Sequence, residues 1–167
     1  MKFLKAIYHL NAIIQYVFLK ILYGSSFTIG KHTTWRKHFN VMVDIGAKVE
    51  IGSNCFFNND CSINANKLVK IGDGTIFGEN VKIYDHNHRF ANLSTAIKEQ
   101  GFSVGEVVIG SHCWIGSNVV ILKGTIIGDN CVIGAGVVLS GEIKSNTIVK
   151  NTCNYTMEAI KGAENYE

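Results

Sequence analysis

The segment IYDHNHRF, residues 83–90, places Asp85, His86 and His88 close together in the chain. Histidine has an ordinary pKa of about 6.5, so it can take a proton from a hydroxyl group near neutral pH. A neighbouring carboxylate can orient the ring and stabilise its charged form. The same two histidines could instead bind a metal ion with His112 as a third ligand, or simply lie on the surface. The surrounding sequence has to decide between these interpretations.

Composition and charge narrow the class of protein. The chain has 167 residues, is 47% hydrophobic and 17% charged, and contains 17 glycines and no proline. We expect a single domain with a substantial core. The net charge of +3 comes from scattered Lys and Arg residues, which argues against nucleic-acid binding. The N-terminal segment lacks a cleavage site and is interrupted by polar residues, so we expect a cytoplasmic protein.

From about residue 29 the sequence repeats every six residues. A period of six fits neither a helix nor a simple strand, and it predicts a short strand followed by a corner. Three such units close a triangular coil of about 18 residues, and stacked coils share one apolar core. We expect the bulky residue that opens each unit to point inward. These residues are Ile45, Ile51, Phe57, Ile63, Ile71, Phe77, Ile83, Ile109, Ile115, Ile121, Ile127, Ile133 and Leu139.

The fifth position of each unit is small or β-branched. It is occupied by Cys55, Cys61, Cys113, Cys131, Thr75, Thr125, Val119 and Val137. Free cysteine behaves as a small buried hydrophobe, and the five cysteines lack the spacing of a zinc site. We therefore expect the cysteines of the repeat to be structural rather than nucleophilic. Cys153, in the tail, lies outside the regular repeat.

This pattern resembles the hexapeptide-repeat acyltransferases over roughly residues 29–150. The resemblance implies an all-β fold, a left-handed parallel β-helix of about five to six coils. We expect an amphipathic N-terminal helix at residues 1–23, the β-helix at residues 24–150 with an extruded loop at residues 89–106, and a C-terminal tail at residues 151–167.

The N-terminal segment has the periodicity of an amphipathic helix. One helical face is formed by Phe3, Ile7, Leu10, Ile14, Val17 and Ile21. We expect this face to cap the open end of the β-helix or to pack in an oligomer. The alternative is a helix on the membrane surface, assisted by Lys2, Lys5 and Lys20.

The repeat is interrupted at length between Ile83 and Ile109. Loops extruded from a solenoid usually lie on its binding face. Counting in sixes predicts that positions 83 and 87 point inward. Asp85, His86 and His88 should therefore reach solvent or a neighbouring chain.

The segment GENVKIYDHNHRF resembles the part of galactoside and streptogramin acetyltransferases that carries their catalytic histidine. The match at residues 87–89, Asn-His-Arg, implies that His88 is the general base, with His86 as second choice. Asp85 is the candidate orienting carboxylate, and the sequence leaves open which of the two rings it would orient. The resemblance also implies acceptor contacts at Asn58 and Trp114, and coenzyme A contacts at Ser117, Ala135 and Ser140.

The chain also departs from the family pattern. Gly141 stands where a lysine is expected after Ser140, and the usual Gly-x-Pro-Ala ending is absent. The phosphates of coenzyme A would then depend on other cations, such as Lys144 or Lys150. The histidine spacing of the zinc-binding β-helical carbonic anhydrases is not reproduced either.

The resemblance implies an acetyl-CoA-dependent O-acetyltransferase that needs no metal and acts on a sugar hydroxyl, in the synthesis of capsule or lipopolysaccharide. It also implies a homotrimer with active sites between subunits, and direct transfer without a covalent enzyme intermediate. A lipid-linked acceptor would give the N-terminal helix a reason to contact the inner face of the membrane. The alternatives are a broad small-molecule or amino-sugar acetyltransferase, a non-catalytic β-helix and a metal-dependent hydratase.

Overall fold

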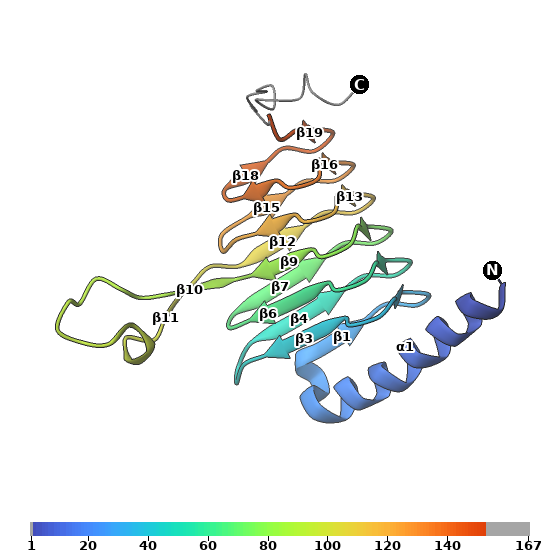
Figure 1. The fold of residues 1–167 in the computed structure, drawn as a ribbon, viewed down its shortest axis with the longest axis horizontal. Coiled ribbons are helices and arrows are strands. Elements are labelled where there is room, and N and C mark those ends of the chain that lie inside the picture. Colours follow the sequence, from blue (N-terminus) through green and yellow to red (C-terminus); the bar gives the residue numbers. More distant parts are fainter. Residues whose placement is uncertain (1, 153–167) are drawn as a thin grey trace, which may run out of the picture.

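The computed structural model describes the backbone of residues 2–152 and the side chains of residues 8–152. Cys153 and nearly all of the tail at residues 151–167 lie outside the described residues. The chain begins with helix α1 (Lys2–Tyr23), followed by a 3-10 turn, η1 (Gly24–Ser26). All the following strands except two belong to three parallel sheets that form the sides of a prism (Figure 1).

We call the three sheets faces A, B and C. Face A contains β1 (Phe27–Ile29), β4 (Lys48–Ile51), β7 (Leu68–Ile71), β12 (Val107–Ile109), β15 (Ile126–Ile127) and β18 (Glu142–Ile143). Face B contains β2 (Thr34–Trp35), β5 (Phe56–Phe57), β8 (Ile76–Phe77), β13 (Trp114–Ile115), β16 (Val132–Ile133) and β19 (Ile148–Val149). Face C contains β3 (Asn40–Val43), β6 (Ser62–Ala65), β9 (Lys82–Tyr84), β14 (Val120–Ile121) and β17 (Val138–Leu139).

The chain visits faces A, B and C in turn, so each circuit is one coil and the strands of one face come from successive coils. We name the connections corner AB, corner BC and corner CA. The predicted fold class, an all-β parallel β-helix with one N-terminal helix and one extruded loop, is confirmed.

The core is the predicted apolar column. The residues that open the repeat units from Ile51 onward are at most 6% exposed. Ile45 is an exception, because it is fully exposed in a corner CA, at residues 44–47, and the prediction for it was wrong. The chain departs from the six-residue spacing at this corner, and Ala47, which is completely buried, takes the inward position instead.

Where the fifth position of a unit is Cys or Thr, its short side chain reaches a backbone carbonyl of the next coil. The Cys55 thiol donates to the Gly72 carbonyl of the next coil, with 3.2 Å between Sγ and O. The Thr75 hydroxyl donates to the Gly110 carbonyl at 2.8 Å in the same way. Burial raises the pKa of the thiols of Cys55, Cys61 and Cys113 above its ordinary value of 9.0. These cysteines are therefore buried hydrogen-bond donors, as expected for structural residues.

The fourth position of each unit turns the corner in the left-handed region of backbone space. It is often asparagine, such as Asn54 or Asn118, but His32, His38 and His112 take the same conformation, with φ between 58° and 62°. Histidine is among the residues that tolerate this region. The position of His112 is thus explained by the coil itself, and among the described residues no group of three or more His, Cys, Asp or Glu side chains could hold a metal ion.

Helix α1 lies at the N-terminal end of the coil stack (Figure 1). The expectation that its predicted apolar face caps the β-helix was wrong, whereas packing of that face in an oligomer stays a prediction. Ala12 and Leu19, both 5% exposed, join the core together with Tyr16 and Tyr23, whereas Ile14 remains 60% exposed. The face that packs is the one opposite to the predicted apolar face.

Polar side chains of α1 explain this choice of face. Gln15 Nε2 donates to the Phe39 carbonyl at 2.6 Å, and its Oε1 accepts the Trp35 indole N–H at 2.8 Å. Lys20 and Tyr23 each donate to a first-coil carbonyl, of Phe27 and Val41 respectively, at 3.2 Å. These carbonyls have no strand beneath them, and unpaired backbone groups need partners.

Corner CA is the only corner of the described coils that varies in length. Corners AB and BC recur unchanged, as in residues 30–33, 52–55, 72–75 and 110–113. Corner CA spans residues 44–47, 66–67, 85–106, 122–125 and 140–141 in successive coils. The longest of these contains Asp85, His86 and His88.

Candidate active site

The long corner CA is an antiparallel hairpin that projects from the side of the prism (Figure 1). It consists of β10 (His86–His88) and β11 (Phe102–Val104), with a 3-10 turn, η2 (Ile97–Glu99), near its tip. His88 pairs with Phe102 in the ladder. The Phe102 ring centroid lies 5.0 Å from that of His86 and 4.5 Å from that of His88. Residues two apart on a strand share a face, so one phenyl ring contacts both imidazoles.

Asp85 is completely buried, and the prediction that it reaches solvent was wrong. The alternation of β9 continues for one more residue past Tyr84, so Asp85 turns inward and position 87 does not. The Asp85 carboxylate accepts the backbone N–H groups of residues 66, 67 and 68 at 2.8, 2.6 and 2.8 Å. It therefore holds the corner CA of the preceding coil.

The Asp85 carboxylate also fixes one histidine. Its Oδ1 lies 3.1 Å from Nδ1 of His86, whose side chain is 17% exposed. A neutral His86 that donates its Nδ1 proton to Asp85 carries its free lone pair on Nε2. His86 borders a cleft of about 350 Å³, whose other walls are Tyr23, Met42, Val43, Asp44, Asn64, Ala65, Asn66 and Phe102.

His88 lies further out on the hairpin and is exposed. It borders a second hollow, of about 550 Å³, which is lined by Arg89, Phe90, Ala91, Asn92, Thr95, Glu99, Gln100 and Ser103. Within residues 8–152 its imidazole has no hydrogen-bond partner, and its contact is with Phe102. Asp85 thus orients His86 and not His88, a choice that the spacing of the sequence left open.

The remaining predicted residues fall into two groups. Trp114 lies on face B, 55% exposed, and Ser117 and Ala135 follow on corner BC in successive coils. Ser140 lies at a corner CA, on the same edge of the prism as the hairpin. A single chain therefore does not bring Trp114 and Ser117 together with the histidines.

Asn58 is also on corner BC, and it has partners within the chain. Its Oδ1 accepts a hydrogen bond from Arg36 Nη1 at 3.1 Å and from the backbone of residue 59 at 2.9 Å. The Arg36 guanidinium in turn lies 5.7 Å from the centre of the Phe56 ring. Arg36 and Phe102 are contacts that sequence reasoning missed, because neither belongs to a motif and only the coil stacking and hairpin register bring them to the site.

Sequence and structure comparisons agree with this architecture. The family described as "Bacterial transferase hexapeptide (six repeats)" matches residues 106–141. The solved structure of a maltose O-acetyltransferase from Clostridium difficile is 32% identical, with a TM-score of 0.65, and the similarity covers 81% of this chain and 71% of that one. This chain belongs to the hexapeptide-repeat transferase family.

Two further family members are informative. A galactoside acetyltransferase solved in complex with coenzyme A is 26% identical, with a TM-score of 0.51, over 77% of this chain and 63% of that one. WbbJ of Escherichia coli, a putative lipopolysaccharide biosynthesis O-acetyl transferase, is 34% identical over 56% of this chain and 55% of its own length. The chain spans between 38% and 55% of the length of the curated relatives that it matches.

Proposed function

We propose that this chain is an acetyl-CoA-dependent O-acetyltransferase that modifies a sugar hydroxyl in surface polysaccharide biosynthesis. The observation that carries the proposal is the hairpin, where two histidines and a buried carboxylate interrupt the repeat of a hexapeptide-repeat transferase. The maltose, galactoside and lipopolysaccharide enzymes among its relatives support an acetyl donor and a sugar acceptor.

The active site is proposed to lie between copies of the chain. His88, on the projecting hairpin of one copy, would face Trp114, Ser117 and Ala135 of a neighbour, because one chain holds these residues on separate edges of the prism. Ser117 and Ala135 are small residues stacked on one corner, which leaves room for an extended cofactor arm beside them. Lys144 and Lys150 are both exposed and are proposed to bind the phosphates. A homotrimer gives each hairpin one such neighbour.

His88 is proposed as the general base. Its exposed imidazole removes the proton from the acceptor hydroxyl as the oxygen attacks the thioester carbonyl, and it returns that proton to the departing thiolate. The C–S bond breaks as the new C–O bond forms, so no covalent enzyme intermediate is needed. His86, oriented by Asp85, is the second candidate for the same role. With His88 as the base, His86 and Phe102 have the role of positioning the acceptor and the His88 ring.

Replacing each histidine separately tests this assignment. Acetyl transfer to sugar acceptors is followed by the release of free coenzyme A. His88→Asn is expected to lower kcat by on the order of 100-fold or more, as for the loss of a general base, with a smaller loss for His86→Asn. His38→Asn is the matched control, because His38 is an exposed histidine on another corner and asparagine accepts its left-handed backbone. A larger loss in His86→Asn would move the role of base to the Asp85–His86 pair.

A mixing experiment tests the location of the site. His88→Asn and Trp114→Ala chains, each expected to be inactive, are refolded together. Mixed assemblies contain interfaces with both native residues, so activity should reappear. The control is a mixture of His88→Asn with a chain that carries both His88→Asn and Trp114→Ala. This mixture should recover no activity. If the first mixture stays inactive, both residues belong to one chain's own site. A separate measurement tests the transferase proposal itself: it is overturned if acetyl-CoA does not raise the Tm of the wild type.

A further inference from the structure

The outward side of α1 is a continuous apolar surface. Seven large apolar side chains of this helix are between 52% and 79% exposed, and we call them the outer stripe: Leu10, Ile13, Ile14, Val17, Phe18, Ile21 and Leu22. Successive helical residues are rotated by about 100°, which places Ile14, Val17 and Ile21 opposite the packed residues Ala12 and Leu19. An exposed apolar patch of this kind marks an interaction surface.

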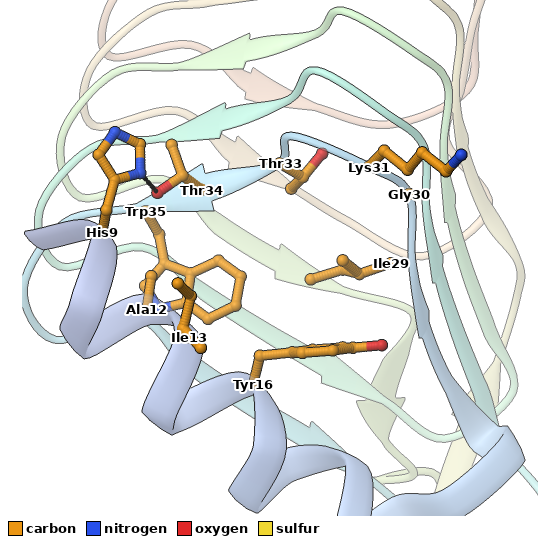
Figure 2. A pocket seen from close by; sticks show the side chains of 10 residues that line it. All are labelled: His9, Ala12, Ile13, Tyr16, Ile29, Gly30, Lys31, Thr33, Thr34 and Trp35. Carbon is orange, nitrogen blue, oxygen red and sulfur yellow. Dashed lines mark hydrogen bonds between the residues drawn. The ribbon is translucent and has the colours of Figure 1, made fainter.

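The outer stripe is not needed to close the β-helix. The opposite face supplies the buried contacts of α1, through Ala12, Tyr16, Leu19 and Tyr23. Figure 2 shows this junction, where Tyr16 and His9 of the helix face Trp35 and Thr34 of the first coil, with 3.2 Å between His9 Nδ1 and Thr34 Oγ1. Within the described residues the stripe is therefore left uncovered and available to a partner outside the fold of one chain.

The charged residues of the N-terminal part of the chain, up to residue 43, have a single sign. Residues 1–43 contain six Lys or Arg residues and no Asp or Glu, and the first acidic residue is Asp44. Lys31 lines the cavity on one flank of α1, together with Ile13 and Tyr16. Arg36 and Lys37 line the hollow on the other flank, beside Tyr8 and Asn11. Basic side chains thus border the helix on both sides.

This arrangement fits a negatively charged surface better than a second copy of the stripe. Two stripes that meet about a twofold axis would bring identical basic flanks together, and like charges across an interface are unfavourable. An anionic bilayer instead accepts apolar side chains at its acyl boundary and attracts the flanking cations to its phosphates. No helix in residues 2–152 is long and apolar enough to cross a membrane, so α1 would lie along its surface.

We propose that α1 binds the surface of an anionic lipid bilayer, with the outer stripe inserted and Lys31, Arg36 and Lys37 at the level of the lipid phosphates. The coil stack then stands on the membrane by its N-terminal end. Tyr23, the last residue of α1, lines the same cleft as His86. The cleft beside His86 is therefore held close to the bilayer, where a lipid-linked sugar can reach it; this last consequence rests on the transferase function proposed above.

Vesicle co-sedimentation of the full chain tests the proposal without any activity measurement. The wild type should sediment with mixed phosphatidylcholine–phosphatidylglycerol vesicles, less with pure phosphatidylcholine vesicles, and less again at high salt. Ile21→Asp should lower the partition coefficient about tenfold or more, because it places a charge in the inserted face. Ile148→Asp is the matched control, since Ile148 is a 63% exposed isoleucine of β19, at the opposite end of the coil stack from α1 (Figure 1), and it should leave binding unchanged.

The basic flanks need a separate variant. Lys31→Glu combined with Lys37→Glu should lower binding to the anionic vesicles at least about tenfold, because each basic residue near such a surface contributes roughly a factor of five. Light scattering of the same proteins reports their oligomeric mass. Wild-type protein that stays in the supernatant overturns the proposal. The proposal is also overturned if Ile21→Asp reduces the oligomeric mass while vesicle binding persists, because the stripe would then join copies of the chain.

Discussion

Corners AB and BC differ from corner CA, although all three belong to the same coil. Corners AB and BC keep the same length in every described coil, and at corner AB the fifth position repeatedly presents a thiol or hydroxyl that donates to the next coil, as at Cys55 and Thr75. Corner CA changes in length from coil to coil and carries the hairpin with His86 and His88. Stacking constrains the first two corners, and the third is free to acquire chemistry.

The variable corner is nevertheless anchored where it leaves the coil. Asp85 holds three backbone N–H groups of the coil before it, and its own carbonyl accepts the Gly105 N–H at 2.8 Å. Lys67 and Glu106 add an exposed ion pair at 3.1 Å. The hairpin therefore projects from an anchored base, which suits the proposed contact of His88 with a neighbouring copy.

Asp85→Ala should have the largest effect on stability. It leaves three part-buried N–H groups without their acceptor, and we expect a loss of about 3 kcal/mol in the free energy of unfolding. Urea denaturation measures it. Glu106→Ala removes only the exposed pair nearby and should cost less than about 1 kcal/mol. Equal losses in the two variants would mean that the base of the hairpin is not held by Asp85.

Glycine substitutions compare the two kinds of corner directly. A Cβ atom at Gly72, on corner AB, would lie 2.6 Å from the backbone nitrogen of Ser111, whereas one at Gly105, on corner CA, would lie 3.1 Å from that of Gly124. We expect Gly72→Ala to cost about 2 kcal/mol through overpacking and Gly105→Ala distinctly less. Thermal unfolding of the two variants measures the difference. The reverse order would show that corner CA is the more tightly stacked one.

Alkaline pH should weaken corners AB and BC selectively. The pKa of the buried thiols of Cys55, Cys61 and Cys113 is raised, so the folded state keeps protons that the unfolded chain releases as pH passes 9.0. The unfolding free energy is fully retained below that pH and falls above it, by up to about 1.4 kcal/mol per pH unit for each thiol. Cys113→Ala should show a shallower decline than the wild type in urea titrations. An unchanged slope would exclude this thiol as a cause.

The tip of the hairpin should tolerate change best. Leu93 is 99% exposed, so Leu93→Ser should alter the unfolding free energy by less than about 0.5 kcal/mol. Leu139→Ser, at a buried position of the coil, is the contrasting variant. Differential scanning calorimetry compares them. A clear loss of stability in Leu93→Ser would show that the tip is packed in the assembled protein.

The sequence predicted the coils well because a six-residue period has few physical solutions. It failed at Asp85, since counting in sixes cannot show that a strand continues one residue further into a hairpin. It failed for a different reason to identify the face of α1 that caps the first coil. The periodicity of Leu10, Ile14 and Val17 identifies an apolar face, but the first coil needed hydrogen-bond donors such as Gln15 and Tyr23.

The candidate site was only partly predictable for a similar reason. The histidines could be located because they interrupt the repeat. Asp85 could be named as an orienting carboxylate, but its choice of His86 depends on its burial, and the contact of both rings with Phe102 depends on the hairpin register, neither of which spacing encodes. His112 attracted attention as a metal ligand, whereas its backbone angle explains it as one of several corner residues.

The donors that α1 presents to the first coil have a consequence for assembly. A stack of parallel strands can grow by adding the end of one molecule to the end of another, as in a filament. Gln15, Lys20 and Tyr23 occupy the carbonyls of Phe39, Phe27 and Val41 that such growth would use. The helix thus covers the N-terminal end of the stack, and a protein shortened to begin at Gly24 should associate through the carbonyls exposed there, which light scattering would detect.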